Sequence, residues 1–290
     1  MLNDNGLISE THVSRIIHVR SEMDILEAFH LARKEHLHIA MMGKQHSQAG
    51  QSLSSQAIEL DMLPFNKVVS IDLHKKQITV ESGMTWGDLQ KYINPYNLAI
   101  KSMQSPNIFT VGGSMSVNAH GDDFRAGAVG NSVVAFHLQL EGGPKVLVTP
   151  DKEPILWSAA LGGYGLIGVI TDVTFQLTDN DWLKSNYQET QVDKFDLYFQ
   201  EKIAGEKSVA LFYAHLNIVP GADFLRNMYV ITYTNTYALP DKIETLDNPD
   251  KWNSLLTPIF NLSRYGRLGK AWRWDLEKIR RYDRELAHNI

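Results

Sequence analysis

The sequence contains no cysteine among its 290 residues. This absence excludes disulfides, thiol nucleophiles, zinc–thiolate sites, iron–sulfur clusters and cofactors linked through cysteine. Long apolar runs are also absent, since no stretch reaches the roughly 18 residues that a transmembrane helix requires. Met1–Arg20 lack a basic start followed by an apolar block, so we expect no secretory signal and a cytoplasmic location.

Charge of one sign is not in large excess, because 28 basic and 33 acidic residues leave a formal net charge of −5. This balance argues against nucleic acid as a partner. No pair of histidines has the spacing and carboxylate support of a metal site, so we predict no metal. Hydrophobic residues at 43% and charged residues at 21% indicate a folded globular chain. Its length suits about one to two domains.

The N-terminal part has the pattern of a βαβ unit. Arg15–Val19 and His38–Met42 are short apolar runs typical of buried strands. Between them, apolar residues recur close to helical spacing over Glu22–Glu35, and Ser21 is a plausible N-cap. We expect the two strands to be parallel, as is usual for such a unit, and Ala57–Leu60 to add a third strand.

The chain continues with antiparallel signals, which together predict an α+β protein. One predicted hairpin pairs Val68–Leu73 with Gln77–Glu81, and another pairs Val133–Glu141 with Lys145–Thr149. The predicted helices are Thr85–Ile93, which Pro95 ends, and Ile155–Leu161. Gly168–Leu177 is a predicted strand. A polar break at Thr178–Asp181 then predicts a domain boundary, with domains over 13–179 and 180–290. In the second domain Ser208–Val219 and Asn227–Tyr237 read as two strands, a ribbon that would leave its aromatic side chains partly exposed.

One glycine motif is misleading on inspection. Gly163–Gly168 matches G-x-G-x-x-G, but a dinucleotide fingerprint requires a strand before it and a helix after it. Here a helical stretch precedes the motif and a strand follows, so we interpret it as a glycine turn into a strand.

Two other stretches could approach a ligand closely. Met42–Gly50 follows a predicted strand directly, and its backbone N–H groups and Lys44 could hold an anion. Thr110–Gly121 contains paired glycines followed by Ser, Asn and His. Taken alone, the first is more often an ordinary loop, and the second a turn followed by a helix of small residues.

The order of these stretches resembles the FAD-binding domain of the vanillyl-alcohol-oxidase superfamily, the flavoproteins with a PCMH-type fold, over about residues 13–178. The family's G-x-G-H-S loop matches Gly43–Ser47, and its V-x-x-G-x-x-x-x-D-L segment matches Val80–Leu89. The T-V-G-G segment matches Thr110–Gly113, and the N-x-H-G segment matches Asn118–Gly121. The G-N-x-V segment matches Gly130–Val133, and the closing G-x-x-G-V-I strand matches Gly165–Ile170. Aldonolactone and alditol oxidases and decaprenylphosphoryl-ribose oxidase are the most similar members, chiefly through Thr110–Val133.

The resemblance implies a PCMH-type FAD-binding domain made of two α/β subdomains, followed by a substrate domain with an antiparallel sheet. It also implies FAD as the cofactor and oxidation of a C–OH group of a sugar, polyol or aldonolactone-like substrate by hydride transfer to the flavin. The residues that it assigns to the cofactor are Met42, Gly43, Lys44, Gln45, His46, Ser47, Gly83, Thr110, Gly112, Gly113, Ser116, Asn118, His120, Gly121 and, through its backbone, Ile170. His46 occupies the position that carries a covalent flavin bond in several members, and the catalytic base stays unassigned.

Two departures from the family pattern matter. Gln45 stands where the cradling loop usually has glycine, and its side chain could narrow the approach to pyrophosphate. The family's members are also longer, so we expect an incomplete substrate domain and little turnover from this chain alone. The alternatives are an enolpyruvyl-sugar reductase-like flavoenzyme fed by NADPH, and an FAD-binding fragment without turnover or one that needs a partner chain.

A basic, amphipathic segment closes the sequence. The basic residues Arg264, Arg267, Lys270, Arg273, Lys278, Arg280 and Arg281 alternate with acidic and aromatic ones. We favour a solvated helix face with i,i+4 ion pairs over a surface for an anionic substrate or a membrane headgroup layer.

Overall fold

The computed structural model describes residues 1–8, 10–236, 258, 261, 263–264, 266–282 and 286–288. These residues fall into two compact units. The first comprises Met1–Gly121 with Arg125–Asp179, and the second comprises Asp122–Phe124 with Asn180–Ile290. The chain leaves the first unit after Asp179, inside the polar stretch that marks the predicted boundary.

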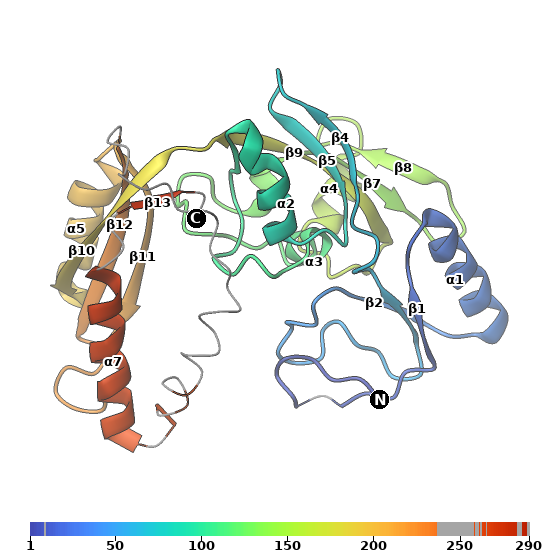
Figure 1. Ribbon diagram of the computed structural model, residues 1–290. Helices are drawn as coiled ribbons and strands as arrows, with labels where there is room; N and C mark the ends of the chain where they lie inside the picture. Colours follow the sequence, from blue (N-terminus) through green and yellow to red (C-terminus); the bar gives the residue numbers. More distant parts are fainter. Residues whose placement is uncertain are drawn as a thin grey trace. The chain divides into compact units, whose positions relative to one another are not determined.

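A small parallel sheet begins the first unit. Its elements are β1 (Arg15–His18), α1 (Glu22–Glu35), β2 (Ile39–Met42) and β3 (Ile58–Asp61). The predicted parallel arrangement is confirmed, but β3 lies between β1 and β2 and pairs with both. Helix α1 lies along one face of this sheet (Figure 1) and buries Ile25 and Phe29 against Ile58 and Leu60. Ser21 begins α1 through the predicted cap, reinforced by a capping box with Asp24.

A larger antiparallel sheet forms the rest of this unit. Its strands are β4 (Val68–Asp72), β5 (Gln77–Glu81), β6 (Leu98–Ile100), β7 (Val133–Gln139), β8 (Lys145–Val148) and β9 (Val169–Asp179). Their order is β4-β5-β9-β7-β8, and β6 pairs with the far end of β9. Both predicted hairpins are confirmed, as β4–β5 and β7–β8. The sequence analysis did not predict β6.

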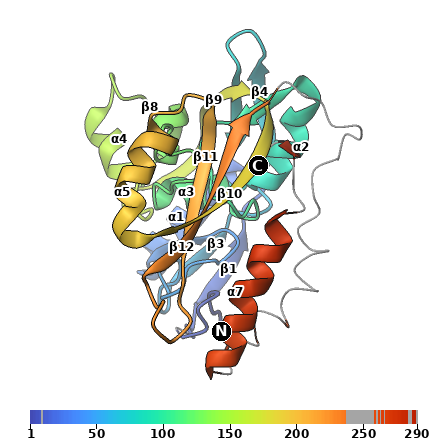
Figure 2. The ribbon, with the colours of Figure 1, turned by 90° about the vertical axis from the view of Figure 1, so that its left-hand side faces the viewer.

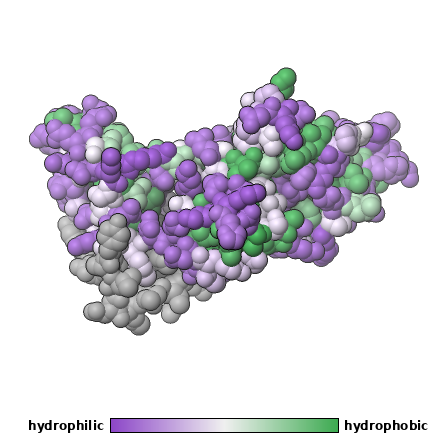
Figure 3. All heavy atoms as spheres, turned by 90° about the horizontal axis from the view of Figure 1, so that it is seen from above, coloured by the Kyte–Doolittle hydropathy of each residue, from purple (hydrophilic) through white to green (hydrophobic). Residues whose placement is uncertain are grey.

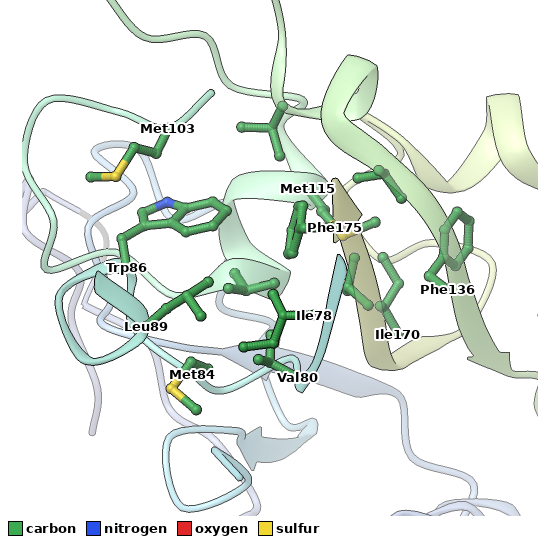
Figure 4. Packing of buried hydrophobic residues seen from close by; sticks show 14 of the residues in the cluster. Ile78, Val80, Met84, Trp86, Leu89, Met103, Met115, Phe136, Ile170 and Phe175 are labelled. Carbon is green, nitrogen blue, oxygen red and sulfur yellow. The ribbon is translucent and has the colours of Figure 1, made fainter. Parts of the chain in front are cut away.

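Short helices cover this larger sheet. They are α2 (Trp86–Ile93), the 3₁₀ turns η1 (Asn94–Tyr96) and η2 (Val129–Ser132), α3 (Val111–Ser116) and α4 (Pro154–Ala160). Thr85 caps α2 by accepting a hydrogen bond from the backbone N–H of Asp88. Between the helices and the sheet, Trp86, Met115 and Phe175 point toward one another in the core (Figure 4), with the rings of Trp86 and Phe175 5.4 Å apart.

A charged cluster joins the two sheets of the first unit. Lys145 on β8 contacts Glu22 at the start of α1, and its Nζ lies 3.3 Å from Oδ2 of Asp172 on β9. The other oxygen of Asp172 lies 2.7 Å from Nδ1 of His137 on β7. Since Asp172 is buried and fully partnered, the cluster fixes α1 against the β7–β8 edge of the larger sheet.

The second unit contains a four-stranded antiparallel sheet of order β11-β12-β10-β13. Its elements are β10 (Trp182–Gln191), η3 (Val192–Lys194), α5 (Phe195–Tyr198), the π-helical η4 (Phe199–Ala204), β11 (Val209–Leu216), β12 (Asn227–Asn235), α7 (Gly266–Tyr282) and β13 (Leu286–His288). The predicted two-stranded ribbon is therefore wrong, because β10 pairs along the whole of β12 and extends the sheet.

Both faces of this sheet carry a helix, and the predicted partial exposure of the aromatic residues is confirmed for Phe212, Tyr213 and Tyr233 but wrong for Tyr229, which is buried. Helices α5 and α7 lie on opposite sides of the sheet (Figure 2). Phe212 packs with Phe199 and Ile203 on the α5 side. On the other side, the Tyr229 ring lies 4.9 Å from that of Trp274 in α7, and Tyr229 is fully buried. Tyr237, the last residue of the predicted ribbon, lies outside the described residues.

The basic segment near the C-terminal end is helical, as predicted. Arg267, Lys270 and Arg273 lie on α7, while the side chains of Lys278, Arg280 and Arg281 lie outside the described part. Among the described residues, no helix combines the length and hydropathy needed to cross a bilayer. On the face shown in Figure 3, hydrophilic residues predominate and exposed hydrophobic residues gather in small groups.

Candidate functional site

A cavity of about 300 Å³ opens in the first unit, where segments far apart in the sequence converge. Its lining consists of Met41, Met42, Gly43, Lys44, Gln45, His46, Ser47, Gln51, Ser52, Met62, Ser82, Gln104, Phe109, Thr110, Gly112, Gly113, Ser114, Ser116, Val117, Tyr164, Gly165, Gly168, Val169 and Ile170. The structure thus brings the two predicted ligand stretches, Met42–Ser47 and Thr110–Ser116, to one cavity, together with the predicted residue Ile170 from β9.

The two stretches touch at Gly43 and Thr110. A Cβ on Gly43 would stand 2.3 Å from the Thr110 hydroxyl oxygen, so only glycine fits there. Thr110 is itself fixed, because it caps α3 and accepts a hydrogen bond of 3.3 Å from the Gly113 N–H. The loop after β2 and the start of α3 therefore form one continuous wall of backbone.

Gln45 adopts a left-handed conformation with φ of 53°. This region favours glycine, the residue that the family pattern has at this position. The side chain turns back along the loop, with Nε2 3.0 Å from the Met42 sulfur, and the Gln45 carbonyl accepts a hydrogen bond from Asn5. Gln45 thus keeps the backbone course of a glycine while adding a side chain to the cavity wall.

The N-terminal segment holds this loop from outside the predicted domain limits. The Asp4 carboxylate accepts hydrogen bonds from the Gly50 N–H at 2.6 Å and from the Gly6 N–H at 3.0 Å. The Gly50 N–H is the largest cause that holds the Asp4 pKa below its usual value. Gly6 lies so close that a Cβ there would meet the Gln48 carbonyl oxygen at 2.0 Å. Starting the domain at residue 13 left this clamp out, and no local pattern signals it.

His46 lies in the cavity wall with a defined tautomer. Its Nδ1 lies 2.8 Å from the Lys44 carbonyl oxygen. Because a carbonyl only accepts hydrogen bonds, Nδ1 carries the proton and Nε2 of the neutral ring keeps its lone pair. The edge of the ring packs on Phe109, with centroids 5.1 Å apart. His46 is therefore oriented by two partners, with Nε2 as its unprotonated nitrogen.

The turn before β9 also contributes to the cavity. Tyr164 and Gly165 have positive φ angles of 53° and 74°, and β9 begins directly after Gly168. The interpretation of Gly163–Gly168 as a glycine turn into a strand is confirmed. Of this region, only the strand residue Ile170 was predicted to contact the ligand, and the structure adds Tyr164, Gly165 and Gly168 to the lining. The sequence signal that could have identified these residues was the glycine turn itself, because it directly precedes the strand that carries Ile170.

Four predicted cofactor residues lie outside the lining: Gly83, Asn118, His120 and Gly121. Two of them are glycines for reasons of packing. A Cβ on Gly83 would meet the Met62 carbonyl oxygen at 1.8 Å, and one on Gly121 would meet the Met103 carbonyl oxygen at 1.9 Å. These contacts explain the glycines without any ligand.

The other two have different surroundings. Asn118 adopts a left-handed conformation with φ of 45°, and its Oδ1 accepts a hydrogen bond of 3.0 Å from the Gly130 N–H, which ties the end of the α3 segment to η2. His120 is exposed, and its backbone forms an isolated bridge with Ala128. Their assignment to the cofactor stays a prediction.

A buried carboxyl group lies elsewhere in the same unit. Glu59 on β3 is fully buried, and neither of its carboxyl oxygens has a hydrogen-bond partner. This burial raises its pKa from 4.5 to about 8. Its register partners are Ile16 on β1 and Ala40 on β2. No sequence pattern marks this residue, because charged side chains such as Glu are almost never fully buried. Within the described residues, no group of three or more metal-ligating side chains occurs.

Comparison with known proteins identifies the first unit. Residues 13–147 match the family described as FAD binding domain. A putative D-arabinono-1,4-lactone oxidase of Neurospora crassa is 31% identical over 55% of this chain and 29% of its own length. The L-gulonolactone oxidase of Mus musculus is 28% identical over 53% of this chain and 34% of its own. The L-galactono-1,4-lactone dehydrogenase 2 of Oryza sativa subsp. japonica is 22% identical over 89% of this chain and 40% of its own.

Solved structures agree on the fold. A structure of alkyldihydroxyacetonephosphate synthase superposes with a TM-score of 0.63 at 15% identity, covering 76% of this chain and 46% of the other. The chain thus spans less than half the length of the proteins named here. The predicted fold, the FAD cofactor and the kinship with sugar-lactone oxidases are confirmed. Residues 13–147 form an FAD-binding domain of the PCMH type, and the chain's relatives are aldonolactone oxidases and dehydrogenases.

Proposed function

We propose that this chain is the flavin-binding part of an oxidoreductase that oxidises a C–OH group of an aldonolactone or a similar sugar or polyol. One observation carries the proposal: the loop after β2, the start of α3 and the strand end at Ile170, far apart in the sequence, line one cavity. The relatives act on lactones according to their names, which supports that substrate class.

The cavity suits the two chemically distinct parts of FAD. Glycine at Gly43, where a Cβ would clash with Thr110, keeps a wall of bare backbone whose N–H groups can approach a diphosphate. Lys44 adds a positive charge to the same loop. The α3 wall offers the neutral hydroxyl of Ser116 and the flat surfaces of Gly112 and Gly113 to an uncharged ring system. The donor set therefore fits the group that the family binds.

The roles of the chain's own residues follow from that fit. Gly43–Ser47 hold the diphosphate through backbone N–H groups, with the charge of Lys44 nearby. Thr110–Ser116 and the backbone of Ile170 position the ring and exclude water from one side. Bound FAD supplies the hydride acceptor. The side chain that takes the substrate's hydroxyl proton stays unassigned.

His46 is the candidate for a covalent link to the flavin. Since its Nδ1 proton is committed to the Lys44 carbonyl, the lone pair of Nε2 is the one available for a bond. The Phe109 contact holds the ring in place for it. If the link forms, acid precipitation leaves the yellow colour in the protein pellet, and His46→Ala moves the colour to the supernatant. Colour in the supernatant for the unaltered chain would reject the link but not the binding.

Flavin binding and reduction test the proposal directly. The purified chain, with or without added FAD, is expected to show bands near roughly 370 and 450 nm. Under anaerobic conditions L-gulonolactone, D-arabinono-1,4-lactone or L-galactono-1,4-lactone should bleach the 450 nm band, and NADPH should not. A folded chain that takes up no FAD refutes the proposal. Bleaching by NADPH but by no lactone would favour the enolpyruvyl-sugar reductase class, which none of the relatives reported above represents.

A further inference from the structure

Three side chains form a closed hydrogen-bond network at the cavity wall. The indole Nε1 of Trp86 lies 2.9 Å from the Ser114 hydroxyl oxygen and 3.0 Å from Oε1 of Gln104. The Ser114 hydroxyl lies 2.7 Å from the same Gln104 oxygen. Trp86 and Ser114 are almost fully buried, while Gln104 and Ser114 line the cavity. No recognised motif contains Gln104, and the sequence analysis did not single it out.

The chemistry of the partners fixes how the Gln104 amide is turned. An indole N–H can only donate, so the Gln104 atom that faces Trp86 is the oxygen. The Ser114 hydroxyl accepts from Trp86 and donates its own proton to Gln104, which gives Oε1 a second donor. A flipped amide would turn its NH₂ group toward the Trp86 N–H, so that two donors would face each other and the Trp86 bond would be lost. The carboxamide is therefore locked with its NH₂ group pointing away from Trp86 and Ser114.

Gln104 Nε2 has two protons to donate, and no acceptor among the described residues receives either. Gln104 is half-buried, and its Nε2 is not one of the fully buried atoms, so water or a ligand in the cavity can reach it. Since Gln104 lines the cavity, whatever occupies the cavity is the natural acceptor.

The rigidity of the network indicates a fixed acceptor. Trp86 cannot move without disturbing the core, because its ring packs against Phe175 and is fully buried (Figure 4). Ser114 lies on α3, between the glycines that line the cavity and Ser116. A preorganised donor loses little entropy when it meets a rigid partner, and a flat ring with acceptor atoms on its edge is such a partner.

We propose that Gln104 is a cofactor-contacting residue, whose locked amide donates to an acceptor on the pyrimidine side of the flavin, and that Trp86 and Ser114 are its positioning residues. This inference rests on the proposed function. The acceptors on that side are N1, N5 and the two carbonyl oxygens. Reduction adds electron density there, so a donor binds the reduced ring more tightly than the oxidised ring and raises the flavin's reduction potential.

The central variants remove the donor and its lock separately. Gln104→Leu removes the amide, and Gln104→Met is a second variant that keeps an unbranched chain. Trp86→Phe and Ser114→Ala keep Gln104 but leave its oxygen with fewer partners. Gln90→Leu is the matched control, because Gln90 accepts a hydrogen bond from Asn107 in the same unit and does not line the cavity. Three quantities are measured for each variant: the dissociation constant of FAD, the reduction potential of the bound flavin against a reference dye, and the melting temperature of the apoprotein.

Gln104→Leu and Gln104→Met should weaken FAD binding about tenfold, the size of one hydrogen bond to a half-buried donor. If the unaltered chain prefers the reduced ring tenfold, loss of that preference lowers the reduction potential of the bound flavin by about 30 mV. Trp86→Phe or Ser114→Ala should change binding and potential in the same direction by less, and the change should vanish when Gln104→Leu is already present. Gln90→Leu should leave both values unchanged.

The outcomes separate the two proposals. If the unaltered chain binds FAD but both Gln104 variants retain its affinity and potential, the inference about Gln104 is wrong and the proposed function stands. If Trp86→Phe still changes the potential in the absence of Gln104, the lock is wrong. A folded unaltered chain that binds no FAD overturns both.

Discussion

Replacing Glu59 should make the protein more stable, and increasingly so as the pH rises. Glu59 is fully buried, and its two carboxyl oxygens have no partner. In the folded state burial raises its pKa from 4.5 to about 8. Each unit of difference between folded and unfolded states corresponds to about 1.4 kcal/mol. The full penalty, reached above the folded pKa, is therefore about 5 kcal/mol.

The sign of this effect is fixed by which state holds the proton. The unfolded chain releases the Glu59 proton near pH 4.5, while the folded chain keeps it until about pH 8. Between these values the folded state binds more protons, so the free energy of unfolding falls as pH rises. About 3 kcal/mol of the penalty is present at pH 7, and a further 1 to 2 kcal/mol should appear by about pH 9.

Urea unfolding at pH 5, 7 and 9 measures the effect. Glu59→Gln removes the charge at similar size, and Glu59→Met also removes the polar group while conserving volume. Both variants should be more stable than the unaltered chain at pH 7 by up to about 3 kcal/mol, and should lose the Glu59 contribution to the slope between pH 5 and 9. Glu141→Gln, an exposed glutamate in a surface ion pair with Arg33, is the control and should preserve the slope. A wild-type slope in the Glu59 variants would refute the reasoning.

Three further predictions concern the loop after β2. Gly43→Ala should destabilise the first unit by about 1–3 kcal/mol through its clash with Thr110, and Thr110→Ala in the same chain should recover part of the loss in thermal unfolding. Gln45→Gly should stabilise the chain by about 0.5–1 kcal/mol, because the relief of a left-handed backbone outweighs the added flexibility of the unfolded state; urea unfolding that shows Gln45→Gly to be less stable would contradict this. Asp4→Ala should weaken FAD binding in a fluorescence titration, because the hydrogen bond from the Gly50 N–H to the carboxylate is lost. In the unaltered chain the same hydrogen bond should be lost as the pH falls below 3.8 toward the lowered pKa of Asp4.

Much of the fold could be predicted because its signals are local. Helix α1 begins after Ser21, whose capping interactions with Asp24 span one turn, and Thr85 with Asp88 does the same for α2. The strand β10 could not be found this way. Its sequence, Trp182–Gln191, is polar along most of its length, so it lacks alternating hydrophobicity and is a strand chiefly through its pairing with β12.

The residues of the candidate site also divide into those with a local sequence signal and those without one. Gly43 and Thr110 could be predicted because each lies in a short stretch that matches a family motif, directly after a strand for Gly43 and at the start of a helix for Thr110. Gln104 and Asp4 could not, because their roles depend on contacts with residues distant in sequence: Trp86 for the first and Gly50 for the second. Nothing in the residues beside Gln104 or Asp4 differs from an ordinary polar loop.

The hydrogen bond between Asp4 and the loop after β2 can form only when both partners have been synthesised. Asp4 leaves the ribosome 46 residues before Gly50, the residue whose N–H it accepts. Until that stretch has emerged and the loop after β2 has turned, the carboxylate has no partner. The segment around Asp4 is thus fixed only once Gly50 has been made, and a flavin that arrives earlier meets the loop after β2 without this contact. A tag fused ahead of Met1 would hinder the hydrogen bond between Asp4 and Gly50. Such a tag should therefore slow FAD uptake during refolding while leaving the β4–β9 sheet unaffected.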